Sequence, residues 1–200
     1  MIILIEGSQG SGKSHMVNFL KKRCRLDKNI IFYKYQHVSH LKNLNIEEIE
    51  PNDSFHYFTV SNTLTILELH KTVLKDKIFV FDRGVFSAYA WSIMRKRLGS
   101  DALYNEISRL LVSDLYRDCH VIRVKSGKDS TRAHSDLFDR YADTVKEDFI
   151  FDTLFDKNMD LIDDSFKHNS YTEVSNEKDS LSEAIMWQTF NKLVYQNEYK

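Results

Sequence analysis

The chain opens with a short, unbroken apolar run that is closed by a glycine-rich turn. Residues 1–6 read MIILIE, and residues 13–25 then place Val17, Leu20 and Cys24 at helical spacing, with basic residues on the other face. An apolar run of this length, bounded by a turn, is typical of a parallel strand buried on both faces. The start of the chain is therefore expected to fold as strand, loop and helix.

Four further segments have the length and the residue types of strands. They are short and rich in β-branched and aromatic residues, and they cover residues 30–35, 78–82, 120–125 and 170–175. Helical patterns separate them, at residues 64–74, 86–99 and 103–111. Strands that alternate with helices predict an α/β fold with a parallel sheet and helices on both faces. Ligands of such folds bind beyond the carboxyl ends of the strands.

The last helix is predicted to begin at Ser180. Ser180 and Glu183 have the spacing of a capping box, in which the side chains at the start of a helix satisfy its first main-chain N–H groups. The sequence thus predicts both the position of this helix and the residue that caps it.

Composition and charge exclude several classes of protein. A chain of 200 residues, 42% of them hydrophobic, is expected to form a single domain over residues 1–200. Because 28 Lys and Arg residues balance 29 Asp and Glu residues, it is not a polybasic nucleic-acid binder. No apolar run approaches the ~18 residues of a membrane span, so no membrane partner is expected. With no signal peptide and only Cys24 and Cys119, which are interpreted as core residues, a cytoplasmic protein is predicted, in the host cytoplasm if the source is viral.

The strongest motif is a phosphate-binding loop between the first strand and the first helix. The pattern G-x-x-x-x-G-K-[ST] is matched by Gly7, Ser8, Gln9, Gly10, Ser11, Gly12, Lys13 and Ser14. Its glycines let successive main-chain N–H groups point at phosphate oxygens, and the following helix adds the positive end of its dipole. Lys13 is expected to reach the β- and γ-phosphates of ATP, and Ser14 to ligate Mg²⁺.

A second candidate site lies where Asp82, Arg83 and Gly84 follow the predicted strand at 78–82. If this strand neighbours the first one, its carboxyl end lies beside the phosphate loop. Asp82 could then hold Mg²⁺ through water or accept a proton, and Arg83 could bind an acceptor phosphate with two hydrogen bonds. Gly84 would permit a close approach. The alternative is that Asp82 and Arg83 only cap the next helix.

Basic residues gather after the fourth predicted strand. They are Arg123, Lys125, Lys128, Arg132 and Arg140. Phosphoryl transfer needs cations that close over the γ-phosphate and exclude water, so residues from about 125 to about 140 are expected to form a lid, with Arg132 as its main contributor. A solvated basic loop is the alternative. Phe58 and Tyr89 are weaker candidates for stacking on a base, because most aromatic residues of such a chain pack in the core.

Two segments resemble the thymidylate kinase family of P-loop nucleotide kinases. IILIEGSQGSGKS is similar to its opening strand and phosphate loop, and IFVFDRGVFSAYAW is similar to its D-R-x-x-x-S-x-x-A-Y segment, through Asp82, Arg83, Ser87, Ala88, Tyr89 and Ala90. The resemblance implies a P-loop kinase fold with a five-stranded parallel sheet and a lid. It also implies that Arg83 binds the acceptor 5′-phosphate and that Asp82 organises Mg²⁺ and the phosphates of ATP.

Other positions depart from that family and leave the acceptor open. Gln9 stands where the family usually has an acidic residue, and only His70 and Lys71 are found where it usually has an arginine. A thymidylate or deoxynucleoside monophosphate kinase is the leading interpretation, and a homodimer is compatible with it. The alternatives are a deoxynucleoside kinase, a phage kinase that phosphorylates 5-hydroxymethyluracil in DNA, and a non-catalytic nucleotide-binding protein. Catalysis is assigned to Lys13, Asp82, Arg83 and Arg132, and Mg²⁺ binding to Ser14 and Asp82.

Overall fold

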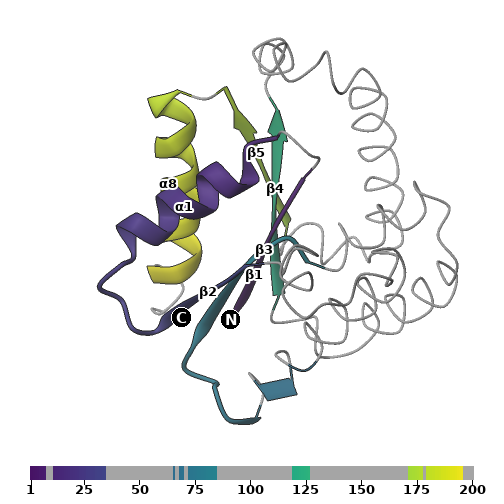
Figure 1. Cartoon of the computed structure of the whole chain (residues 1–200), viewed down its shortest axis with the longest axis vertical. Coiled ribbons are helices and arrows are strands. Elements are labelled where there is room, and N and C mark those ends of the chain that lie inside the picture. Colours follow the sequence, from purple (N-terminus) through teal and green to yellow (C-terminus); the bar gives the residue numbers. More distant parts are fainter. Residues whose placement is uncertain are drawn as a thin grey trace, which may run out of the picture.

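Figure 1 shows the computed structural model of the chain, which describes residues 1–7, 11–34, 65, 68–69, 72–84, 119–126, 171–177 and 179–195. Its strands are β1 (Ile2–Glu6), β2 (Ile30–Lys34), β3 (Ile78–Asp82), β4 (Cys119–Ser126) and β5 (Tyr171–Asn176). They form one five-stranded sheet in the order β2-β3-β1-β4-β5, and all neighbouring pairs are parallel. Each of the predicted strands is confirmed to within one residue at either end.

Strand β1 occupies the centre of the sheet, as its continuous apolar sequence predicts. All of its residues are buried. On one side it pairs with β3, with Ile5 opposite Asp82, and on the other side it pairs with β4, with Glu6 opposite Arg123. This register places residues from three distant segments of the chain side by side at the carboxyl edge of the sheet, where the phosphate loop leaves β1.

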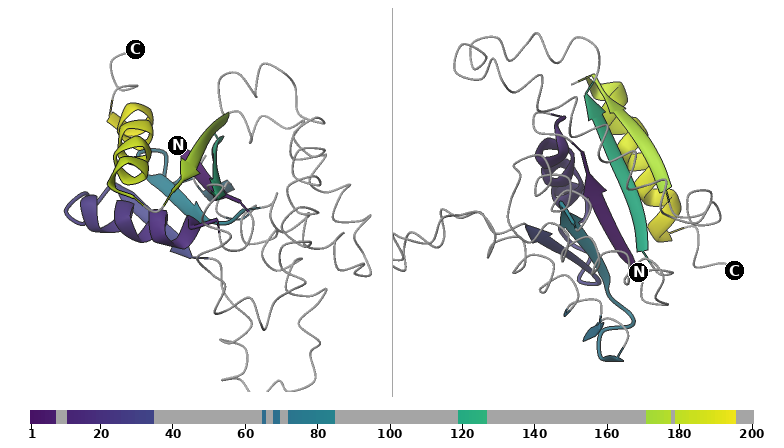
Figure 2. Two further views of the ribbon diagram at one scale, coloured as in Figure 1. Left: turned by 90° about the horizontal axis from the view of Figure 1, so that it is seen from above. Right: turned by 90° about the vertical axis from the view of Figure 1, so that its right-hand side faces the viewer.

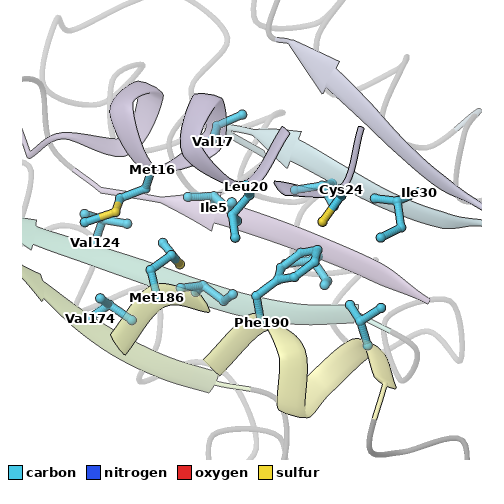
Figure 3. Packing of buried hydrophobic residues seen from close by; sticks show 14 residues of the cluster. Ile5, Met16, Val17, Leu20, Cys24, Ile30, Val124, Val174, Met186 and Phe190 are labelled. Atoms are coloured by element: carbon cyan, nitrogen blue, oxygen red, sulfur yellow. The ribbon is translucent and has the colours of Figure 1, made fainter. Parts of the chain in front are cut away.

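One face of the sheet is covered by α1 (Lys13–Arg23) and α8 (Ser180–Tyr195), which Figure 2 shows on the same side. Figure 3 shows how their apolar side chains meet those of the strands. The core contains Ile3, Ile5, Met16, Val17, Leu20, Cys24, Ile30, Val80, Ile122, Val124, Val174, Met186, Phe190 and Val194. Cys24 and Cys119 are both buried free thiols, so their interpretation as core residues is confirmed.

Two polar contacts join α1 to α8 at the edge of this core. The guanidinium of Arg23 lies 5.3 Å from the ring centroid of Trp187, and His15 Nε2 lies 2.9 Å from Glu183 Oε1. Helix α1, which begins at the phosphate loop, therefore contacts α8 near both of its own ends.

Side chains on the opposite face of the sheet are buried as well. Because side chains alternate along a strand, Leu4, Phe81 and Val121 point away from α1 and α8, and each is at most 1% exposed. The helices predicted at 86–99 and 103–111 lie outside the described residues. Of the helix predicted at 64–74, residues 65, 68, 69 and 72 are helical, whereas residues 73 and 74, which the structure also describes, are not, so the predicted end of this helix is too late. Within the described parts of the chain, no helix has the length and apolar character needed to span a membrane.

Helix α8 begins at Ser180 as predicted, but the expected capping residue is wrong. Asp179 Oδ1 accepts hydrogen bonds from the main-chain N–H and the hydroxyl of Ser182, at 2.7 and 2.6 Å. Asp179 and Ser182 have the same three-residue spacing as Ser180 and Glu183, and a carboxylate is a stronger acceptor than a hydroxyl. Glu183 pairs with His15 instead.

Candidate active site

The ends of the phosphate loop adopt a backbone that requires glycine. Gly7 has φ 149° and Gly12 has φ 89°. A Cβ atom on Gly7 would lie 2.3 Å from the main-chain oxygen of Val124 and 2.8 Å from Ser11 Oγ, so the loop packs directly against the end of β4. Ser8, Gln9 and Gly10 lie outside the described residues.

Helix α1 presents an N-terminus that suits an anion. Its N-cap is Gly12, so no side chain at the N-cap bonds to the first main-chain N–H groups of the helix, and the first turn contains no acidic residue. Lys13 is only 3% exposed, and its Nζ lies 3.5 Å from Ser11 Oγ. The positive end of the helix dipole and a buried lysine thus meet at the loop, which is the arrangement expected for phosphate binding.

Asn176 holds the far end of the phosphate loop and is a residue that sequence reasoning missed. It ends β5, it is 1% exposed, and its Nδ2 donates a 2.9 Å hydrogen bond to the main-chain oxygen of Ser11. A Cβ atom on Gly12 would lie 1.7 Å from the same nitrogen. The only signal in the sequence is an asparagine at the carboxyl end of the last strand.

The predicted metal ligands Ser14 and Asp82 lie next to each other. Ser14 Oγ donates a 3.1 Å hydrogen bond to Asp82 Oδ2. Asp82 is 6% exposed, and its other oxygen, Oδ1, is buried and has no hydrogen-bond partner. Leaving a buried carboxylate oxygen unsatisfied is costly, which fits a position that a cation or its water ligands would occupy. The described residues contain no group of three or more His, Cys, Asp or Glu side chains that could hold a metal ion.

After Asp82 the chain makes a tight turn that sets the direction of Arg83. Arg83 has φ 75°, a left-handed conformation that non-glycine residues rarely adopt. Its N–H donates to the main-chain oxygen of Ile5 at 3.0 Å, and the N–H of Gly84 donates to Glu6 Oε1 at 3.0 Å. A Cβ atom on Gly84 would lie 3.0 Å from Glu6 Oε1, so Glu6 approaches this glycine closely. Glu6 is fully buried, and sequence reasoning treated it only as the end of an apolar strand.

The structure removes two of the five cations from the proposed lid. Arg123 is 1% exposed in β4, and its Nη1 lies 3.5 Å from Glu173 Oε1, while Lys125 Nζ lies 2.8 Å from Glu173 Oε2. Burial alone would raise the pKa of Glu173, but hydrogen bonds from Lys125 and Tyr171 outweigh it and lower that pKa. Arg123 and Lys125 therefore contact β5, and β4 continues to Ser126, so the approximate range of 125–140 expected for the lid overlaps the end of this strand by two residues.

Several other predicted residues fall outside the described parts of the chain. They are Lys128, Arg132 and Arg140 of the lid, the aromatic residues Phe58 and Tyr89, the base-side positions His70 and Lys71, and residues 87–90 of the second motif. The structure thus brings together Ser11, Lys13, Ser14, Asp82 and Arg83 from the predicted set and adds Glu6 and Asn176 to it.

Solved structures of similar architecture include two kinds of kinase. A thymidylate kinase from Ehrlichia chaffeensis has a TM-score of 0.59 at 13% identity, over 95% of this chain and 98% of its own. The fold is that of the P-loop kinases. A thymidylate kinase from Candida albicans aligns with a TM-score of 0.58 at 14% identity, over 100% of this chain and 93% of its own.

A deoxyadenosine kinase is a third solved structure of similar fold. A deoxyadenosine kinase from M. mycoides with bound dCTP has a TM-score of 0.53 at 14% identity, over 96% of this chain and 100% of its own. No family model matches the sequence, and no curated protein matches it either. The similarity is thus one of fold, and the reaction depends on which residues occupy the site.

Proposed function

We propose that this protein transfers the γ-phosphoryl group of ATP to a pyrimidine deoxynucleotide, with thymidylate or a related deoxynucleoside monophosphate as the leading acceptor. The observation that carries the proposal is the contact between Ser14 and Asp82. It joins the end of the phosphate loop to the strand that continues into Arg83, so that a donor site and an acceptor site share one edge of the sheet.

On the donor side, the loop from Gly7 to Ser14 binds the phosphates of ATP. Main-chain N–H groups of the loop and of the N-terminus of α1 donate hydrogen bonds to the phosphate oxygens, and Lys13 contacts the β- and γ-phosphates. Because Lys13 is buried, its charge is less screened by water than that of a surface lysine, and it acts strongly on the phosphoryl group that is transferred.

Ser14 and Asp82 would hold the Mg²⁺ that accompanies ATP. Both supply oxygen atoms, which magnesium prefers, and Asp82 Oδ1 is buried without a hydrogen-bond partner. When bound, the ion neutralises charge on the phosphate oxygens. Ser14 and Asp82 contribute by holding their oxygens in a fixed arrangement, which their mutual hydrogen bond supports.

On the acceptor side, Arg83 binds the 5′-phosphate of the monophosphate. An oxygen of that phosphate forms a bond to the γ-phosphorus, the bond from the γ-phosphorus to the β,γ-bridging oxygen breaks, and ADP leaves with the electron pair. A phosphate monoester is largely a dianion at neutral pH, so its oxygen attacks without a base to remove a proton. A hydroxyl acceptor would lose a proton in the same step and would need such a base. Arg132 remains the predicted lid residue over the γ-phosphate.

A deoxynucleoside kinase is the second candidate function. The fold similarity to the deoxyadenosine kinase, which extends over 96% of this chain, favours testing it. Its acceptor would be a 5′-hydroxyl in place of a 5′-phosphate. A kinase that acts on 5-hydroxymethyluracil in DNA shares the hydroxyl chemistry and is tested in the same assay.

The test is transfer of label from γ-labelled ATP to four acceptors in parallel. They are deoxynucleoside monophosphates, the deoxynucleosides themselves, DNA that contains 5-hydroxymethyluracil, and unmodified DNA as the control. We expect labelled diphosphates, with thymidylate among the best acceptors. Label in nucleosides alone would favour the second candidate, and label only in the modified DNA would favour the DNA-base kinase. ATP binding without transfer to any acceptor would make the protein a nucleotide-binding module.

A further inference from the structure

Glu6 is a fully buried carboxylate at the carboxyl end of β1, beside the end of β3. It is the last residue of β1, opposite Arg123 of β4 in the register of the sheet, and Ile5 beside it is opposite Asp82 of β3. Side-chain alternation directs Glu6 to the face away from α1 and α8. A buried carboxylate is costly unless it is hydrogen-bonded, so a partner that it binds specifically is expected.

A specific partner of Glu6 is the turn that carries Arg83. Glu6 Oε1 accepts the N–H of Gly84 at 3.0 Å, and the contact is buried. The neighbouring N–H, that of Arg83, donates to the main-chain oxygen of Ile5. Two adjacent residues of β1 therefore hold two adjacent amides of the turn, one through the main chain and the other through a carboxylate.

These two hydrogen bonds enclose the one non-glycine residue with positive φ among the described residues. Arg83 has φ 75°, and such a backbone persists only where its surroundings hold it. The bond from Arg83 to Ile5 fixes one side of the residue, and the bond from Gly84 to Glu6 fixes the other.

We propose that Glu6 is a positioning residue that fixes the backbone of Arg83 and thereby aims its guanidinium at the acceptor. The inference rests on the proposed function in one respect, that Arg83 binds the acceptor. Glu6 acts through its hydrogen bond to Gly84 and takes no proton during transfer.

The substitutions Glu6→Gln and Glu6→Asp separate the hydrogen bond from the charge. Glutamine keeps an oxygen acceptor at the same distance along the side chain and removes the charge. Aspartate keeps the charge but is one methylene shorter, so it withdraws the acceptor from Gly84. Ile3→Val is the matched control, since Ile3 is buried in the same strand but points to α1 and α8 and belongs to the core there.

Steady-state kinetics with ATP and with the acceptor, and melting temperature, are measured for each variant. We expect Glu6→Asp to raise the acceptor KM about tenfold with an ATP KM within about twofold of wild type, and Glu6→Gln to stay close to wild type. In an Arg83→Ala background, Glu6→Asp is expected to add little to the acceptor KM, because the residue through which it acts is gone. A variant that only lowers stability, such as Ile3→Val, lowers the melting temperature without raising the acceptor KM relative to the ATP KM.

Two results would overturn the proposal. One is a large loss of kcat in Glu6→Gln at unchanged acceptor KM, which would mean that the carboxylate takes part in the chemistry. The other is a Glu6→Asp crystal structure in which Arg83 retains its positive φ. The crystallographic measurement needs no turnover. If the wild-type protein transfers phosphate to no acceptor, the proposed function fails, while the φ of Arg83 in Glu6→Asp still decides whether Glu6 fixes this turn.

Discussion

Asn176 donates a 2.9 Å hydrogen bond from its side-chain amide to the main-chain oxygen of Ser11, and so ties the last strand of the sheet to the phosphate loop. Both residues are buried, and the same amide nitrogen fills the space that a side chain on Gly12 would need. The shape of the loop therefore depends on a residue at the opposite end of the sequence.

Replacement of Asn176 should weaken ATP binding selectively. Asn176→Asp exchanges the donor for a negatively charged acceptor beside the oxygen of Ser11 and close to the bound phosphates. We expect the KM for ATP to rise about tenfold, with a much smaller change in the acceptor KM. Ser175→Ala, at the exposed neighbouring position of β5, is the control. Equal effects of Asn176→Asp on both substrates would show that the residue supports the fold in general.

Substitutions of Lys13 and Arg83 should change different kinetic constants. Lys13→Ala removes a cation that meets the transferring phosphoryl group, so kcat should fall about 100-fold or more. Arg83→Ala removes a contact that forms before the chemistry, so the acceptor KM should rise while ATP binding stays near normal. Kinetics with each substrate varied in turn checks both. If the two substitutions damage ATP affinity equally, Arg83 belongs to the donor side.

Asp82→Asn should change the magnesium requirement. The amide is similar in size but lacks the negative charge that attracts the ion, so the Mg²⁺ concentration for half-maximal activity should rise about tenfold. Binding of ATP without magnesium, measured by calorimetry in the presence of a chelator, should change little. An unchanged magnesium titration would mean that Asp82 acts through Ser14 and Arg83 rather than on the ion.

His120 should make the protein sensitive to mild acid. It is 8% exposed in β4, its Nε2 lies 2.9 Å from Thr172 Oγ1, and burial lowers its pKa from 6.5 to about 4. The unfolded chain thus binds a proton more tightly than the folded one. Stability is complete above pH 6.5 and falls toward pH 4, on the order of 1 kcal/mol per pH unit. Urea unfolding of wild type and His120→Gln over this range checks it, and parallel curves would contradict it.

The strands could be predicted because each is short, contains β-branched or aromatic residues and is bounded by polar or turn residues. Strand β1 and the residues of α1 that face the core follow directly from their pattern. The position of Asp82 beside the phosphate loop was also expected on the condition that β3 lies beside β1, and the two strands do pair. The pattern of apolar and polar residues thus predicted where the strands lie in the sequence and at which edge of the sheet the site is found.

The remaining contacts depend on register between distant segments, which no local pattern reveals. Arg123 was assigned to a lid because basic residues continue past the end of β4, yet Glu173 of the neighbouring strand engages it inside the sheet. Glu6 and Asn176 were missed for the same reason, because their partners lie far away in sequence. The residue predicted to cap α8 was wrong because two pairs of residues have the spacing of a capping box. Asp179 caps the helix, since its carboxylate is a stronger acceptor than the hydroxyl of Ser180.

The central place of β1 has a consequence for how the protein is made. The strand and its loop are synthesised before their partners, because β1 pairs with residues 78–82 and 119–126 and Asn176 holds the loop. Pairing of parallel strands across such separations is slow, and an unpaired apolar strand is prone to aggregate in the meantime. Strand β1 and its loop therefore reach their final shape only after these later residues have been made. ATP added during refolding should bind only after the end of the chain has joined the sheet.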